Sequence, residues 1–335
     1  MQTRNQKIID AIIKKANRDC PGSLAIIGIY GSFCTGDIHE KSDLDLMILI
    51  NDENGYCLSH TFLLEDEYIG HDLYCTTWEA LENDAQFSHP HISKLMDSKI
   101  VYCANDSYLV RLNDLKAKAA SANTRNSAKN LLQTAEQIFA KAMISSELAE
   151  VRYHAVGMIL SCLDAIALLN GRYYHFGGRR VFEEIGKMKI VPENLHTLVD
   201  TIAKATTVAD LKASLVPLLQ AVETLFAEPL PAPEVYPGTC EEMISNWRNK
   251  MYLAADLNDP WLALNSMASL DAMLKELGFH WNILDQFQPE NLAASAKVYD
   301  KIIAQYRAEY DKAGVSFQSY ANVDAFVNEY TKKKA

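Results

Sequence analysis

The sequence predicts an α+β fold, in which a small mixed-sheet domain comes first and all-helical bundle domains follow. Runs rich in β-branched and other apolar residues, typical of strands, occur before residue 106. Beyond that point apolar residues recur at the three- and four-residue spacing of amphipathic helices. A proline-rich stretch at 229–233 indicates a short stiff connector. We therefore expect three domains, at 1–106, 107–228 and 235–335.

The first domain is expected to combine helices and strands. A helix is predicted at 6–17, where isoleucines recur at helical spacing. Three strands follow, and turn residues or the start of a helix delimit each of them: 24–30, the apolar run that ends at Ile50, and 68–75.

The later domains are expected to be all-helical. The run at 151–169 is a strongly apolar helix, which Asn170-Gly171 ends. After the prolines, tryptophans such as Trp247 and Trp261 are expected to anchor the C-terminal helices.

Composition indicates a cytoplasmic globular protein. Of the 335 residues, 49% are apolar and 22% are charged, which is the balance of a soluble domain. The chain opens on an amphipathic pattern, and no run approaches the roughly 20 apolar residues that cross a bilayer, so we expect no membrane association. The seven cysteines are scattered without C-x-x-C spacing, which favours free thiols over disulfides or a zinc site.

The formal net charge of −11 disfavours binding to duplex nucleic acid, because such binding depends on Lys and Arg side chains that neutralise phosphates. An acidic surface would instead suit a cationic small molecule. Solubility alone also explains the charge, and this is the simpler interpretation.

Two aspartates stand at the entrance of the second strand, in the run Ser42-Asp43-Leu44-Asp45-Leu46. Side chains in a strand alternate between its faces, so Asp43 and Asp45 are expected to share one face. Neighbouring carboxylates repel and raise each other's pKa unless a cation lies between them. The pair therefore favours a hard divalent metal, and the ion usually bound at such a pair is Mg²⁺ in complex with a nucleotide phosphate.

The turn before these aspartates suits a phosphate group. Gly31 has no Cβ, so a phosphate can approach the backbone closely while the following amides point at its oxygens. Ser32 adds a hydroxyl donor. Gly-Ser turns are common, and this one gains its significance from the aspartate pair that follows.

The turn and the Asp43-Leu44-Asp45 run together resemble the signature of the polymerase-β-like nucleotidyltransferase superfamily. The order of segments is similar to that of the kanamycin nucleotidyltransferase type, in which a mixed α/β catalytic domain precedes a helical bundle. The resemblance covers about residues 1–230 and leaves the last hundred residues outside it. It implies that Gly31 holds the nucleotide together with Ser32, and that the two aspartates bind the metal and take part in catalysis.

The resemblance implies further site residues. In the family a third acid on a neighbouring strand joins the metal-binding pair, and Asp72 is the best match, with Glu67 as runner-up. A glutamate from the first bundle helices serves as the base, near a lysine that contacts the nucleotide phosphates. Segment order points to Glu136 as the base and to Lys141 as the lysine. The alternatives for the base are Glu147 and Glu150.

The implied reaction is Mg²⁺-dependent transfer of an NMP from an NTP to a hydroxyl of a small molecule, with release of pyrophosphate. An aminoglycoside-like antibiotic would suit an acidic pocket, and the family precedent also implies a homodimer. Two alternatives remain, a transferase that adds AMP to a protein and a non-catalytic nucleotide-binding module. The fused bundle disfavours the first of these, and the presence of all three acids disfavours the second.

Two other motifs allow both a functional and a structural interpretation. The glycines and paired arginines at 177–180 suit an oxyanion, but we favour a helix entry with exposed arginines. His89 and His91 have no third ligand at a suitable spacing, so we favour a loop over a metal site.

Overall fold

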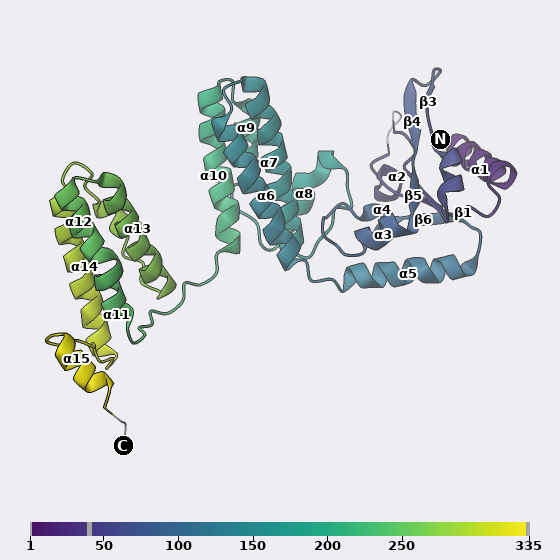
Figure 1. Ribbon diagram of the computed structural model, residues 1–335. Helices are drawn as coiled ribbons and strands as arrows, with labels where there is room; N and C mark the ends of the chain where they lie inside the picture. Colours follow the sequence, from purple (N-terminus) through teal and green to yellow (C-terminus); the bar gives the residue numbers. More distant parts are fainter. Residues whose placement is uncertain (1, 39–41, 333–335) are drawn as a thin grey trace. The chain divides into compact units, whose positions relative to one another are not determined.

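The computed structural model describes residues 2–38 and 42–332. The chain divides into two compact units, Met1–Ala227 and Glu228–Ala335. The segments expected as the first two domains thus belong to one unit, and the boundary falls just before the proline stretch. The α+β class is confirmed, because a small mixed sheet is followed by helices (Figure 1).

The central sheet of the first unit has four strands in the order β5-β2-β1-β6. Strand β1 (Leu24–Ile29) pairs antiparallel with β2 (Leu46–Ile50) and with β6 (Lys99–Cys103). Strand β5 (Cys75–Thr77) runs parallel to β2. Every residue of β1 and β2 is buried, which explains why both read as continuous apolar runs in the sequence.

A two-stranded hairpin is separate from this sheet. Strand β3 (His60–Leu64) pairs antiparallel with β4 (Ile69–Leu73). The expectation of one strand at 68–75 is therefore wrong, because Tyr74 separates β4 in the hairpin from β5 in the central sheet. This division places Asp72 outside the sheet that the aspartate pair enters.

The two faces of the central sheet contact different elements. On one face, Ile27 and Ile48 belong to a core shared with α1 (Gln2–Asp19) and η1 (Glu53–Leu58). On the other face, Met47 belongs to a core that continues into the helices. Side-chain alternation along the strands thus joins the sheet to both layers.

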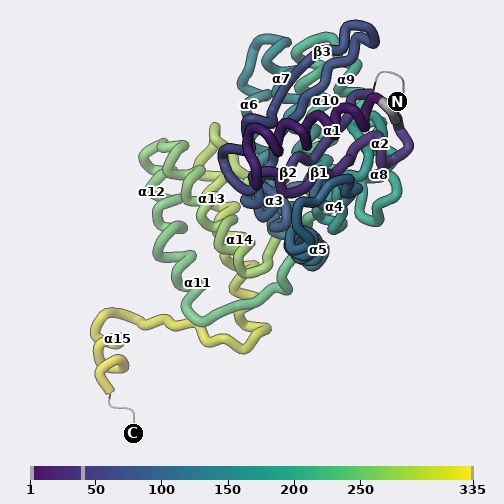
Figure 2. Tube along the Cα trace, turned by 90° about the vertical axis from the view of Figure 1, so that its right-hand side faces the viewer, coloured from purple at the N-terminus to yellow at the C-terminus, as the bar shows by residue number. Residues whose placement is uncertain are grey.

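The remaining helices of the first unit lie beside the sheet and in a bundle (Figures 1 and 2). Side-chain caps begin several of them, as Thr77 does by accepting a hydrogen bond from the Ala80 N–H. The helices that follow the strands are α3 (Trp78–Asp84), α4 (Ser93–Asp97) and α5 (Asp106–Ala120). Those of the bundle and its connections are α6 (Arg125–Ile144), α7 (Leu148–Leu169), α8 (Val181–Ile185), α9 (Leu195–Lys204) and α10 (Val208–Phe226).

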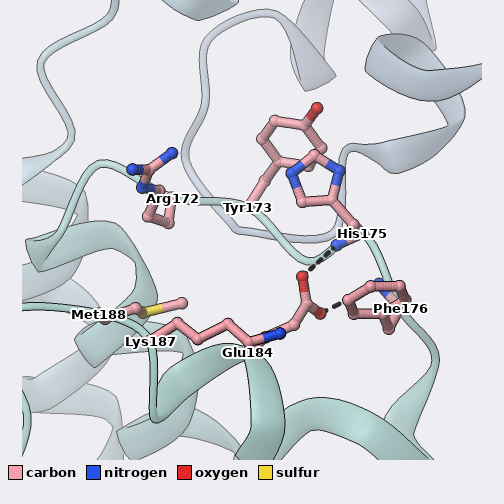
Figure 3. Close-up of a pocket in the computed structure, with 7 residues that line it drawn as sticks. All are labelled: Arg172, Tyr173, His175, Phe176, Glu184, Lys187 and Met188. Atoms are coloured by element: carbon pink, nitrogen blue, oxygen red, sulfur yellow. Dashed lines mark hydrogen bonds between the residues drawn. The ribbon is translucent and has the colours of Figure 1, made fainter. Parts of the chain in front are cut away.

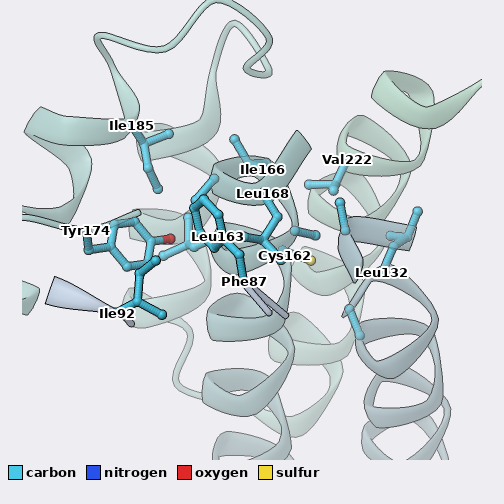
Figure 4. Packing of buried hydrophobic residues seen from close by; sticks show 14 of the residues in the cluster. Phe87, Ile92, Leu132, Cys162, Leu163, Ile166, Leu168, Tyr174, Ile185 and Val222 are labelled. Atoms are coloured by element: carbon cyan, nitrogen blue, oxygen red, sulfur yellow. The ribbon is translucent and has the colours of Figure 1, made fainter. Parts of the chain in front are cut away.

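One apolar core joins the bundle to the sheet. Figure 4 shows Phe87 and Ile92, which precede α4, packed with Ile166 of α7, and with Ile185 of α8. The same cluster reaches Val222 of α10. Because the core is continuous, the sheet and the bundle hold each other in a defined arrangement.

Replacing the fully buried Ile166 with alanine is expected to lower the free energy of unfolding by about 2–5 kcal/mol, since it removes apolar atoms and leaves a cavity. Urea unfolding of the whole chain, followed by circular dichroism, measures this change. The matched control is Leu160→Ala on the same helix, where the side chain is 54% exposed. A loss of equal size in both variants would contradict the packing described here.

Helix α7 is long and apolar enough, by length and composition, to cross a membrane. Half of its most apolar window is buried inside the first unit, as in the core helix of a bundle. The sequence predicted this apolar helix at 151–169, but did not predict that its length and composition would allow it to cross a membrane.

The second unit is helical and has a core of its own, in which Tyr299 and Tyr306 are fully buried. Trp247 packs against this core as expected, whereas Trp261 is 71% exposed and is not among the described side chains that pack against it. Its helices are α11 (Thr239–Glu242), the π-helical turn η3 (Met243–Arg248), α12 (Asn249–Leu257), α13 (Pro260–Glu276), η4 (Ile283–Gln286), α14 (Leu292–Lys312) and α15 (Val323–Tyr330).

Candidate active site

Three segments that are far apart in the sequence line one pocket of about 360 Å³. The first is the turn after β1, the second is the stretch before β2, and the third connects α7 to α8. We call it the aspartate pocket, and its lining residues are Gly31, Ser32, Asp37, Ser42, Asp43, Asp45, Gly177, Gly178, Arg179 and Arg180.

The turn at the end of β1 has a conformation that only glycine adopts readily. Gly31 has φ 68° and ψ −144°, and it precedes the short helix α2 (Ser32–Thr35). A Cβ atom at Gly31 would lie 2.0 Å from Oδ2 of Asp45. The glycine therefore allows the Asp45 carboxylate to lie directly against the turn.

The aspartate pair has the alternation that its sequence predicts. Asp43 is exposed, Leu44 is buried and Asp45 is half-buried, and both carboxylates line the aspartate pocket, although they precede β2. Burial, and then the charge of Asp43, raise the pKa of the Asp45 carboxyl above its usual value, and the backbone N–H of Ser32 offsets part of this shift. A carboxylate in this position would be stabilised by a cation.

The surroundings of Tyr30 also carry excess negative charge. Burial is the largest cause that raises the pKa of its phenol to about 12, and the charges of Asp45, Asp43, Asp72 and Asp84 add to it. Asp72 therefore contributes to the same electrostatic field as the pair, although it does not line the aspartate pocket.

Asp72 is not assembled with the pair into a three-acid cluster. Its Oδ1 accepts a hydrogen bond of 2.9 Å from Thr61 Oγ1 across the hairpin. Glu67, the runner-up, forms an ion pair with Arg4. Within residues 2–38 and 42–332, no three His, Cys, Asp or Glu side chains are placed to hold a metal ion. Asp72 itself belongs to the hairpin, because the strand division at Tyr74 assigns it to β4.

Glu136 and Lys141 lie on α6, and both are exposed. None of the described residues that line the aspartate pocket comes from α6, nor do Glu147 and Glu150 at the start of α7 reach it. Lys141 instead lines a larger, mostly apolar pocket between α6 and α7. The bundle segment that reaches the aspartate pair is the connection after α7.

The last part of that connection, 177–180, was expected to be a helix entry with exposed arginines. It does enter a helix, through η2 (Gly178–Arg180) and α8, but both arginines also line the aspartate pocket. The Arg179 side chain is 77% exposed and that of Arg180 only 27%. The sequence signal for this role was the pair of glycines before the two arginines.

Polar contacts, most of them partly buried, hold the connection in place. Figure 3 shows the Glu184 carboxylate directed at the backbone of the connection, where it accepts hydrogen bonds from the N–H groups of His175 and Phe176 at 2.8 and 3.0 Å. Tyr173 Oη donates to Asp97 Oδ1 at 2.8 Å, and His175 Nδ1 lies 3.0 Å from Asp97 Oδ2. These contacts tie the segment both to α8 and to α4.

The histidines at 89 and 91 belong to a loop, in keeping with the favoured interpretation. His91 Nε2 lies 3.0 Å from Asp164 Oδ2 on α7. The hydrogen bond to Asp164 is the main cause that raises the pKa of His91; burial opposes it and the charge of Asp164 adds to it. His91 thus pairs with a bundle carboxylate.

The pair of His91 and Asp164 should make the free energy of unfolding fall as the pH rises. Because the folded-state pKa of His91 is raised, the contribution is fully present below its unfolded value of about 6.5 and is lost as the pH rises through the folded pKa. The His91 side chain is 60% exposed, so we expect about 0.5 kcal/mol. A double-mutant cycle of His91→Gln and Asp164→Asn, measured by urea unfolding, should give a larger coupling at pH 5.5 than at pH 8.5, and equal couplings would contradict this assignment.

Comparisons with known proteins find similarity to solved structures. No protein-family model and no curated protein matches this chain. Among solved structures, a nucleotidyltransferase-like protein from Exiguobacterium sibiricum is similar to it with a TM-score of 0.34 and 12% sequence identity. The alignment covers 78% of this chain and 86% of that one.

Proposed function

We propose that the protein is a nucleotidyltransferase that moves an NMP from an NTP to a hydroxyl group of a small molecule and releases pyrophosphate. The observation that carries this proposal is the aspartate pocket. It combines a carboxylate pair, a glycine turn against which one carboxylate lies, and two arginines. These are the groups that a metal–nucleotide complex requires.

The donor set fits Mg²⁺ through Asp43 and Asp45. Both are hard oxygen donors that line the aspartate pocket, and burial, together with the charge of Asp43, raises the pKa of Asp45, which a cation would offset. When bound, Mg²⁺ would offset the negative charge that develops on the reacting phosphate. The Gly31 turn would hold the Asp45 carboxylate beside the phosphate chain, and Ser32 would donate hydrogen bonds to that chain.

We infer that Glu136 or Lys141 would act from a second copy of the chain, because neither lines the aspartate pocket of its own chain. The homodimer that the family resemblance implies would supply these residues in trans. Sedimentation velocity should then show a dimer. Glu136→Gln should lower the rate of transfer without changing that assembly, whereas a monomer that transfers at full rate would contradict the role.

The acceptor class is proposed from charge. The net charge of −11 suits a polycationic acceptor such as an aminoglycoside. The test offers the full-length chain each α-³²P NTP with Mg²⁺, in the presence of aminoglycosides, lincosamides or proteins of the source extract. Labelled small molecule is the expected result. Labelled protein would support the AMP-adding alternative, and binding without transfer would support the non-catalytic one.

A further inference from the structure

Both arginines of the aspartate pocket contact the same carboxylate. Nη1 of Arg180 donates to Oδ1 and Oδ2 of Asp37, each at 3.0 Å, and Nη2 of Arg179 donates to Oδ1 at 3.0 Å. Two guanidinium groups on one small anion form the arrangement with which proteins bind phosphate.

Arg180 does not depend on Asp37 for its position. Its Nε and Nη2 donate to the two carboxylate oxygens of Glu183 at 2.6 and 2.8 Å. Hydrogen bonds from Arg180, and then from Lys187, lower the pKa of Glu183 to about 2, so this carboxylate stays charged. The guanidinium also lies over the ring of Phe176, 3.6 Å from its centroid. Two further contacts, with Glu183 and Phe176, thus help to fix Arg180.

Arg179 is the more available of the two cations. In the described part of the chain its only hydrogen bond from the guanidinium goes to Asp37, and most of its side chain is exposed. An anion that takes the place of the Asp37 carboxylate would meet both guanidinium groups. It would do so in the pocket that also contains the Gly31 turn.

We propose that Arg179 and Arg180 bind the terminal phosphates of the nucleotide, and that Asp37 occupies this site as an internal anion until the nucleotide displaces it. That the ligand is a nucleotide rests on the proposed function. The existence of a polyphosphate site does not rest on it. Asp37 lies in the loop after α2, anchored by its N–H bond to the Ser32 carbonyl. Displacement of its side chain would release the hydrogen bond of 3.1 Å that Thr35 Oγ1 donates to Asp37 Oδ2, while the backbone anchor stays in place.

The test measures binding of inorganic tripolyphosphate to the full-length chain by isothermal titration calorimetry, with EDTA present to remove divalent ions. Arg179→Gln should weaken binding about tenfold, because it removes one charge-assisted contact. Asp37→Asn should tighten binding about threefold or more, because it removes the competing charge. The matched control is Arg172→Gln, which makes the same change in the neighbouring pocket of Figure 3, outside the aspartate pocket.

The direction in which Asp37→Asn changes the affinity for tripolyphosphate distinguishes two roles of Asp37. Tighter binding shows that Asp37 competes with the phosphate, and weaker binding shows that it only holds the arginines in position. Weaker tripolyphosphate binding by Asp37→Asn would overturn the proposal, and so would unchanged binding by Arg179→Gln. It would also be overturned if Arg172→Gln weakened binding as much as Arg179→Gln does, or if the wild type did not bind tripolyphosphate. Thermal unfolding of each variant checks that the chain is folded. If Arg179-dependent binding is found but no NTP transfers its label, the polyphosphate site stands and the proposed transferase activity alone fails.

Discussion

Asp45→Asn is expected to lower the rate of nucleotidyl transfer about a thousandfold or more, since it removes one of two carboxylates that would hold the divalent ion. Asparagine has nearly the same shape and can still accept the N–H of Ser32. The change therefore tests charge. The measurement is the initial rate of label transfer from an α-³²P NTP at saturating Mg²⁺.

Stability provides an internal check on this variant. The pKa of Asp45 is raised in the folded chain, so its ionised form is less favourable there than in the unfolded chain. Neutral asparagine should leave the thermal midpoint at pH 7 unchanged or higher. The matched surface control is Asp114→Asn on α5, which should transfer at the wild-type rate. Activity that survives Asp45→Asn would contradict the assignment of this carboxylate to the metal.

Gly31→Ala is expected to abolish transfer and to destabilise the chain by about 3 kcal/mol. Two causes combine: the turn has φ 68° and ψ −144°, and the new methyl group would meet Asp45 Oδ2 at 2.0 Å. The Asp45 side chain would have to leave its place against the turn. Rates of label transfer and urea unfolding measure the two consequences.

Gly22→Ala separates backbone strain from this clash. Gly22 also has a positive φ, of 89°, but a Cβ there would meet no atom within 4 Å. We expect a smaller loss of stability, about 1 kcal/mol, with transfer retained. Equal effects of the two substitutions would show that the contact between Gly31 and Asp45 has no special role.

The local part of the site could be predicted from the sequence, because its residues are close in the chain. Strand periodicity alone places Asp43 and Asp45 on one face, and the Gly31 turn directly precedes them. The structure brings the turn and the two aspartates together in one pocket, although the aspartates precede β2. Their assignment to a metal and a nucleotide stays a prediction.

The part of the site that comes from segments far apart in the chain could not be predicted from the sequence pattern. Arg179 reaches the pocket because Glu184 and Asp97 hold the α7–α8 connection, and no local rule predicts such contacts. Asp72 was misplaced for a related reason. The run 68–75 is continuous in the sequence, yet its two halves pair with different partners, β3 and β2. Pairing between strands is decided by the whole fold.

The central claim is nucleotidyl transfer, and the most direct test of it is to follow the α and γ phosphates of the NTP. The full-length chain is incubated with Mg²⁺ and an acceptor, once with α-³²P NTP and once with γ-³²P NTP. A nucleotidyltransferase labels the acceptor from the α position only, and the γ label leaves as pyrophosphate. Label on the acceptor from the γ position would show phosphoryl transfer and contradict the reaction proposed here, and no label from either position would contradict the assignment of the protein as a transferase.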